Sequence, residues 1–540
     1  MAFKIWAGSS ASTLTGALAL SVVLAACGGG KADTPGAVAV PQCSGSSCPA
    51  QGQPPSTQPV TAQLCPSSLD YSTTYTGGSG SGEYIKMQFN SATKKYQMTF
   101  VESAVPSSVG QVNVTRAGLT ITGDYDNPSG AFALPTAEQN RCAIVLKNGA
   151  TADGTYSVTI NPADPPILFV GQGIIGGGIP GATIQFAGVT SLGFPIGVVP
   201  QRTFDSYPFL GFSETVTDFT QVAGAYNEVG FRMNPEGNPA QGTDGLTTTG
   251  WAPQAVQASE TLNADGTCTP DSSPYSCTLT GAPWTLRTNA DGSPDNVFIS
   301  KVSPTSPNMG YPVAGVGVLQ LLFSPSQAHG IMIVGKVNNQ LVPVMIRVGY
   351  AHTDNNPVNI LNNALDDQLG ISLLAPATKV DASTGLKGGY IGANSASACA
   401  LVTTIGQSPN PIYVNGQPIY AASGTCTDGS ASFNPGVNYG ATLFQSPAAA
   451  LLNPFTSSVS SNFSLDFTQT QPGLVNVTAT KALMSGSTAL YNVGDTGVMV
   501  KVGPVYGLLM NGINPTFTTN DPANNIGKVN PYLSIGAFVE

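Results

Sequence analysis

Apolar and polar side chains alternate with a period of two over several stretches of the chain beyond residue 65. Residues 83–100 show this alternation in two runs, separated by the polar loop Asn90–Lys95, and residues 112–123 show it again. A half-buried strand has this period, so each stretch predicts a β hairpin. Residues 331–349 predict another hairpin, because the pair Asn338-Asn339 at their centre can adopt the positive φ angles that a two-residue turn requires. The pattern predicts mainly antiparallel strands.

A weak repeat divides this part of the chain. Three Gly-x-Tyr triplets each open a predicted strand: Gly82-Glu83-Tyr84, Gly224-Ala225-Tyr226 and Gly388-Gly389-Tyr390. Roughly 85–110 residues after each triplet lies a very apolar pair of strands, at 166–186, 331–349 and 497–510. We therefore expect an all-β fold of three antiparallel meander modules, barrel-like or sandwich-like, over residues 65–205, 206–355 and 356–540. One continuous β structure, such as a propeller, is the alternative.

The composition agrees with an all-β fold and excludes one class of partner. A helical period is suggested only by a short turn at Ile360–Leu369. Charged residues make up 9% of the 540 residues, and glycine (63) and proline (42) are frequent. Hydrophobic residues still reach 41%, which is enough for a folded core. The net charge is −10 and no basic cluster occurs, which excludes nucleic acids as partners.

The first 64 residues predict export and then a linker. Residues 1–26 have the order of a secretory signal peptide, with Lys4 followed by an apolar run, Ala17–Ala25, that is too short to span a bilayer. Residues 27–64 are rich in Gly, Pro, Ser and Gln and have neither a helical nor a strand period. We expect them to form a flexible tether with a reach of roughly 35 Å.

The segment Leu24-Ala25-Ala26-Cys27 resembles the lipobox of bacterial lipoproteins. The resemblance implies that a diacylglycerol is attached to the Cys27 sulfur, that cleavage occurs before this residue, and that the new N-terminus is acylated, with palmitate as an acyl group. Such a set of acyl chains anchors a protein stably. Gly28 stands where an Asp favours retention in the inner membrane, so the resemblance implies the outer membrane, facing the periplasm or the cell surface. A secreted protein with a chance cysteine is the alternative.

The other eight of the nine cysteines predict disulfide bonds, because their number is even and the expected compartment is oxidising. Proximity along the chain favours four pairs: Cys43–Cys48, Cys65–Cys142, Cys268–Cys277 and Cys399–Cys426. None of these pairs has the two-residue spacing of a zinc knuckle or of a redox-active helix. Free buried thiols are the alternative.

A glycine-rich stretch has the glycine spacing of a dinucleotide-binding motif. Gly171, Gly173 and Gly176 have the spacing of a dinucleotide-binding loop and follow a strand-like run. That loop requires a helix to begin at this point, whereas the residues that follow, Gly177–Pro180, oppose a helix. We therefore expect a β turn where two backbones approach closely, and no cofactor.

Two further groups have the residue types of metal sites, and we expect no metal at either. His329 and His352 are the only histidines, and they flank the hairpin predicted at 331–349, which could place them together with Asp354. Ordinary loop histidines are the simpler interpretation. The loop Asn289–Asn296 offers oxygens to calcium but lacks the spacing and the final Glu of an EF-hand.

No catalytic arrangement stands out in the sequence. It contains no Gly-x-Ser-x-Gly motif, and among 29 acidic residues no pair of carboxylates can be singled out. Beyond the lipobox, the chain resembles uncharacterised β-rich lipoproteins of Gram-negative proteobacteria, a likeness that brings no active-site residues with it.

We therefore expect a non-enzymatic, outer-membrane-anchored lipoprotein with a binding or envelope-structural role, whose partner is an envelope protein or a small apolar ligand. One alternative is an envelope-anchored hydrolase that acts on glycans or esters. Another is a carrier that holds a small apolar ligand inside a β-barrel, because the Gly-x-Tyr triplets resemble the opening of lipocalins, where Trp replaces Tyr.

Overall fold

The computed structural model describes most of residues 63–540, which form one compact unit, Gln63–Glu540. Outside the described residues lie 1–62, 131–132, 134–136, 163–164, 187–188, 192–193, 197–198, 237–249, 274, 303–309, 314–316, 321–326, 353–363, 367–368, 382–387, 397–411, 415–416, 420–440, 446–447, 454–457, 482, 486–487, 492, 511–531 and 539–540. The expected signal peptide, the expected lipidation site Cys27 and nearly all of the expected tether fall outside. So do Cys43, Cys48, Cys399 and Cys426.

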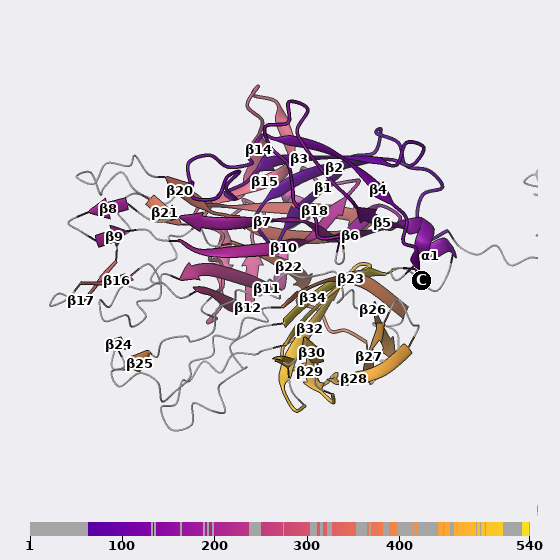
Figure 1. Cartoon of the computed structure of the whole chain (residues 1–540). Coiled ribbons are helices and arrows are strands. Elements are labelled where there is room, and N and C mark those ends of the chain that lie inside the picture. The colour runs from indigo at the N-terminus through magenta and orange to yellow at the C-terminus, as the bar shows by residue number, and fades with distance from the viewer. Residues whose placement is uncertain are drawn as a thin grey trace, which may run out of the picture. The chain divides into compact units, whose positions relative to one another are not determined.

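The first sheet is a closed barrel in which each strand pairs with the next in antiparallel fashion (Figure 1). Its strands are β1 (Tyr75–Ser79), β2 (Tyr84–Asn90), β3 (Lys95–Glu102), β4 (Thr120–Asp126), β5 (Ala143–Leu146), β6 (Ile167–Val170), β7 (Ile174–Phe186) and β10 (Val199–Phe212). The barrel closes because β10 pairs with β1. Helix α1 (Ala137–Cys142) precedes β5, and a small hairpin, β8 (Val189–Ser191) and β9 (Phe194–Ile196), lies between β7 and β10.

The second sheet has eight strands in the order β13-β12-β11-β22-β19-β18-β15-β14. They are β11 (Gly224–Glu236), β12 (Gly250–Leu262), β13 (Cys268–Pro270), β14 (Thr285–Thr288), β15 (Pro294–Lys301), β18 (His329–Val337), β19 (Gln340–Val348) and β22 (Leu369–Pro376). A 3-10 turn, η2 (Phe219–Gln221), precedes β11, and two small hairpins, β16 (Gly310–Val313) with β17 (Gly317–Gln320) and β20 (Tyr350–His352) with β21 (Ala364–Asp366), extend from the sheet's connections. Strand β22 lies beyond residue 355 but pairs with both β11 and β19, so it completes this sheet.

The third sheet is again a closed barrel, drawn in orange and yellow in Figure 1. Its strands are β23 (Gly388–Ala396), β26 (Ala441–Gln445), β27 (Ala448–Asn453), β28 (Ser458–Asp466), β29 (Val475–Ala479), β32 (Thr496–Val502), β33 (Val505–Met510) and β34 (Tyr532–Phe538). Two small hairpins accompany it, β24 (Ile412–Val414) with β25 (Gln417–Ile419) and β30 (Leu483–Ser485) with β31 (Thr488–Tyr491). The prediction of an all-β chain of antiparallel meanders is confirmed.

Local sequence explains several of these elements. Asn338 and Asn339 have φ angles of 49° and 61° and form the turn between β18 and β19, as the hairpin prediction required. The three Gly-x-Tyr triplets do open β2, β11 and β23. In the first of them Gly82 has a φ of 73°, and a Cβ there would lie 2.0 Å from the carbonyl oxygen of Arg347, so only glycine fits.

Two local predictions were wrong. Residues 112–123 do not form a hairpin of their own, because only their end belongs to a strand, β4, whose partner is β3. The described end of the expected helical turn at Ile360–Leu369 lies in strands β21 and β22. In both places the pairing with a strand distant in sequence decided the structure, which a local period cannot show. Among the described residues, no helix is long and apolar enough to cross a membrane.

The second sheet is buried on both faces, which explains the nearly continuous apolar run of β18. On one face, Val229, Phe231, Ile331, Ile333 and Ile346 share a core with residues of both barrels. On the other face, Phe298, Met332, Val334, Met345 and Leu374 pack against Phe219 and Trp284 from the connecting segments.

Large side chains fill the interior of the first barrel. Residues that face one another across β2 and β3 are paired as Ile85–Phe100, Met87–Met98 and Phe89–Tyr96, and all six are at most 1% exposed. The ring of Phe89 makes edge contacts with Tyr75 at 6.2 Å and with Tyr125 at 6.1 Å between centroids. A Cβ on Gly77 would lie 2.5 Å from the Phe209 ring, so the barrel wall is in close contact with its contents.

Candidate functional site

Six ionisable side chains from the first barrel and the second sheet form one connected cluster, which we call the junction network. Its members are Tyr84 and Lys86 on β2, Glu102 at the end of β3, Arg287 on β14, Asp295 on β15 and His329 at the start of β18. On β2 the side chains of Ile85 and Met87 enter the barrel, so Tyr84 and Lys86, on the opposite face of the strand, contact the sheet instead.

Arg287 and Asp295 hold the network together. The Arg287 guanidinium donates from Nε to Glu102 and from Nη1 to Asp295 at 2.8 Å, and its carbon lies 5.6 Å from the centre of the Tyr84 ring. Asp295, whose side chain is 2% exposed, also accepts from Lys86 Nζ at 2.8 Å and from the Tyr84 hydroxyl at 3.1 Å. Burial would raise the pKa of Asp295, but the hydrogen bond of Lys86 and its other donors keep it below the usual value.

His329 is held as a cation. Its Nδ1 lies 3.1 Å from the carbonyl oxygen of Gln327 and its Nε2 contacts the Glu102 carboxylate, so both ring nitrogens must donate. Burial alone would lower the pKa of His329, but the hydrogen bond and the charge of Glu102 outweigh it and raise the pKa. Burial likewise works to raise the pKa of Glu102, and the contacts with His329 and Arg287 hold it below the usual value.

The geometry of the network suits an electrostatic bond between two sheets better than proton transfer. A general base needs a free lone pair within reach of a nucleophile, whereas both nitrogens of His329 are engaged as donors. The hydroxyl of the network, that of Tyr84, donates to Asp295. Burial and then the charge of Asp295 raise the pKa of Tyr84. The network joins β2 and β3 of the barrel to β14, β15 and β18 of the sheet.

We expect the network's contribution to stability to depend on pH. The raised pKa of His329 means that its contribution is complete below its unfolded pKa of about 6.5 and is lost as pH rises through the folded value. The lowered pKa of Glu102 means that its contribution is lost only as pH falls through that folded value. Glu102→Gln should therefore cost about 1–3 kcal/mol at pH 6 and less at pH 9, measured by urea unfolding.

The exposed pair Lys95–Asp124 provides the control for this measurement, because its side chains are 50% and 48% exposed. Asp124→Asn should change stability by about 0–1 kcal/mol at either pH. An equal loss for Glu102→Gln at pH 6 and at pH 9 would show that His329 is not the partner that matters.

The structure brings some of the sequence candidates together and leaves others apart. His329 lies in the junction network, whereas Asp354 and the side chain of His352 lie outside the described residues. In the loop Asn289–Asn296, Asp291 Oδ1 accepts from the backbone N–H and the hydroxyl of Ser293, and Asp295 belongs to the junction network.

The glycine-rich stretch at 171–176 leads into strand β7, as expected. Gly177 has a φ of 146°, and a Cβ there would lie 2.2 Å from the carbonyl oxygen of Ile167 on β6. The glycines therefore allow two strands to approach closely rather than a helix to bind phosphate.

Glu102 and Arg287 were not identified from the sequence. The available signal was weak: both are charged residues in a chain that has few charges. Nothing in the sequence shows that residues 102 and 329 meet across a separation of 227 positions.

A second ion pair is completely buried at one end of the first barrel. Arg116 and Glu83 are both 0% exposed and form two parallel hydrogen bonds of 2.5 Å, from Nε and from Nη2. The Glu83 carboxylate also accepts from the hydroxyls of Ser81 and Ser103, and the guanidinium lies 4.3 Å from the centre of the Phe100 ring. These groups are hydrogen-bonded to one another. Because Arg116 lies in the segment between β3 and β4, its pairing with Glu83 positions that segment.

Among the described residues, the expected disulfides Cys65–Cys142 and Cys268–Cys277 are confirmed, and the cysteines of the other two expected pairs lie outside these residues. Each has a glutamate beside it, Glu138 and Glu260 respectively. Among the described residues these two groups have the spacing of metal ligands, but their sulfurs are bonded to each other and are therefore not available as thiolates.

Comparison with known proteins assigns a family but no activity. The family model described as "Protein of unknown function (DUF2957)" matches residues 95–537. No curated protein matches the chain. Solved structures similar to this chain include two mutants of the vaccine antigen Transferrin Binding Protein B (TbpB) from Haemophilus parasuis Hp5.

The similarity to these two structures is low. Their sequence identities are 10% and 9% and their TM-scores 0.21 and 0.20, with 87% of this chain and 66% of the other chain covered in each case. At these scores the likeness carries no argument about function. The family match spans most of the chain, and the protein therefore belongs to the DUF2957 family.

Proposed function

We propose that the protein is a lipid-anchored protein of the outer membrane whose folded β unit acts as a non-catalytic binding or structural module of the envelope. The lipobox at Cys27 and the polar tether that follows it support the anchor. The compact unit that begins at Gln63 agrees with a tether that ends near this point.

The packing of the first barrel is the observation that supports binding through the outer surface. A carrier of small molecules keeps a hollow, mostly apolar interior of several hundred Å3 (roughly 300–1,000). The described interior of this barrel is instead occupied by aromatic and long apolar side chains, with the buried pair Glu83–Arg116 at one end. This packing favours contacts through the outer surface of the unit over a ligand held within the barrel.

The charged groups support a non-catalytic role over the alternative of a hydrolase. In the junction network the two acids, the imidazole and the guanidinium are all paired with one another. A hydrolase needs one carboxylate or imidazole that is free to take a proton from substrate or water.

Fractionation of the full chain tests the anchor. Cys27→Ser should move the protein from the membrane fraction to the soluble fraction, because the acyl chains have no other attachment site in the lipobox. The matched control is Cys43→Ser with Cys48→Ser, which alters the tether but leaves Cys27 and should remain in the membrane. If the Cys27→Ser protein stays in the membrane fraction, the anchor is wrong. A co-purifying lipid in the native mass spectrum of the Cys27→Ser protein would favour the carrier instead.

A further inference from the structure

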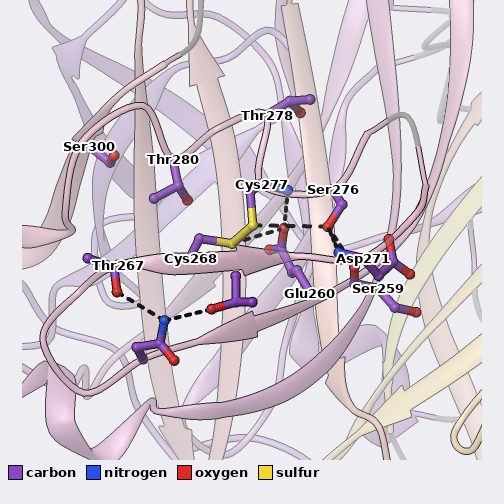
Figure 2. The surroundings of a disulfide bond; sticks show 12 residues. Ser259, Glu260, Thr267, Cys268, Asp271, Ser276, Cys277, Thr278, Thr280 and Ser300 are labelled. Atoms are coloured by element: carbon purple, nitrogen blue, oxygen red, sulfur yellow. Dashed lines mark hydrogen bonds between the residues drawn. A yellow bond between two sulfur atoms is a disulfide. The ribbon is translucent and has the colours of Figure 1, made fainter.

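The two disulfides lie in different surroundings. Cys65 and Cys142 are 3% and 2% exposed, whereas Cys268 and Cys277 are both partly exposed. Cys268 begins the short strand β13. Cys277 lies in a turn, nine residues after Cys268 (Figure 2). The second bridge therefore lies closer to solvent than the first.

The backbone at Cys277 is strained. Its φ is 57°, in the left-handed region that residues other than glycine rarely adopt, and the disulfide and one hydrogen bond hold it there. Opening the disulfide would allow the turn to leave this conformation. Exposed or strained bridges are the ones most easily reduced.

A buried acid lies against this disulfide. Glu260 on β12 is 4% exposed, and its Oε2 accepts from the backbone N–H of Cys277 at 2.6 Å and lies 3.6 Å from Cys268 Sγ (Figure 2). Its Oε1 is buried and has no hydrogen-bond partner among the described residues. A carboxylate in this position would be poorly solvated.

The surroundings favour the neutral acid. Burial and then the nearby charge of Glu228 raise the pKa of Glu260 to about 8, against the opposing effects of the Cys277 N–H and of Arg232. The charged and titratable groups around it are Glu228 and Arg232 on β11, Asp271 and Tyr275 in the turn, and, beside Arg232, Arg347 on β19. Glu260 therefore keeps its proton to a higher pH than an exposed glutamate does.

The other disulfide provides an internal contrast. Glu138 lies 3.9 Å from Cys142 Sγ and accepts from the backbone N–H of Leu64, a similar arrangement. Glu138, however, is paired with Arg141 at 2.7 Å, and this hydrogen bond lowers its pKa. At pH 7 it has no proton to donate.

We propose that Cys268–Cys277 is a thiol-exchange site, at which Glu260 donates the proton that the departing sulfur of Cys268 needs. The reaction partner is a dithiol, either a small molecule or a pair of exposed cysteines on a reducing protein. This inference concerns the second sheet alone and does not depend on the anchor.

The exchange balances in two steps. A thiolate of the dithiol attacks Cys277 Sγ, the S–S bond breaks, and Cys268 leaves as a thiol after taking the proton of Glu260. The second thiolate of the dithiol then attacks the dithiol's first sulfur, which is bonded to Cys277 in the mixed disulfide. Cys277 is released and takes a proton from solvent. The protein gains two electrons, and the dithiol is oxidised to a disulfide.

Reduction of the full chain by dithiothreitol tests the proposal. After quenching with an alkylating reagent, peptide mass mapping follows each bridge separately. At pH 7, Cys268–Cys277 should open at least about tenfold faster than Cys65–Cys142, because it is more exposed and has a proton donor. Its rate per thiolate should fall as pH rises through 8, where Glu260 loses its proton.

Glu260→Gln separates the proton donor from mere exposure. The amide can still accept from the Cys277 N–H but has no acidic proton, so the rate at pH 7 should fall about tenfold and the change near pH 8 should disappear. Glu138→Gln is the matched control and should leave the Cys268–Cys277 rate unchanged. In both variants an unchanged rate for the untouched bridge shows that the protein is folded.

Two results would overturn the proposal. One is a Cys268–Cys277 bridge that opens no faster than the buried one. The other is a Glu260→Gln protein that keeps both the rate and the pH profile of the wild type, because exposure alone would then explain the reactivity.

Discussion

Arg116→Met is expected to destabilise the protein by about 3–5 kcal/mol, because it leaves the Glu83 carboxylate buried without its counter-charge. Both side chains are 0% exposed, so water cannot replace the lost partner. The hydroxyls of Ser81 and Ser103 would remain as the carboxylate's hydrogen-bond donors, but they carry no charge. The substitution also removes the hydrogen bond of Arg116 to the carbonyl oxygen of Gly181 at 3.2 Å.

The loss can be measured by urea unfolding followed by circular dichroism. Lys147→Met removes one partner of an exposed pair, whose side chains are 52% and 60% exposed, and should cost about 0–1 kcal/mol. The double variant Glu83→Gln with Arg116→Met removes both buried charges and should lose less than the sum of the single variants, since no unpaired ion remains. A loss for Arg116→Met as small as that for Lys147→Met would mean that the pair is not buried in solution.

Loss of the Cys65–Cys142 disulfide should have the second large effect, about 4 kcal/mol for Cys65→Ala with Cys142→Ala. The bridge closes a loop of 77 residues, so it removes a large part of the conformational freedom of the unfolded chain. It also ties the segment before β1 to the end of helix α1, directly before β5.

The other disulfide is the comparison for this prediction. Cys268–Cys277 spans only nine residues, and its removal should cost about 2–3 kcal/mol by the same argument. Both double variants can be compared by their urea midpoints under oxidising conditions. A larger loss for the short loop would show that native contacts around Cys268–Cys277, rather than loop length, dominate.

Local patterns were sufficient where a structure depends on neighbours in sequence. The alternation at 83–100 predicted β2 and β3, and Asn338-Asn339 predicted the turn between β18 and β19, because strand period and turn φ angles are properties of a few consecutive residues. The same patterns failed at 112–123, where the strand that forms pairs with β3 rather than within the stretch. Strand pairing is a long-range choice, and it can override a local period.

The candidate site was less predictable than the fold. His329 drew attention as one of only two histidines, but its role as a paired cation depends on Glu102, which lies 227 positions away. Likewise, Asp295 was a candidate calcium ligand until the folded chain placed Lys86, Tyr84 and Arg287 around it.

For this chain, then, the order of residues alone was enough to establish the all-β class, the strand period, one hairpin turn and the short-range cysteine pair Cys268–Cys277. Which acids are buried, and which are paired, was decided by the assembled sheets: Glu102, Glu138 and Glu260 share one side-chain chemistry, yet the pKa values of Glu102 and Glu138 are lowered and that of Glu260 is raised. The physical reason is that burial and neighbouring charge are set by residues far away along the chain, and these come together only when the sheets pack.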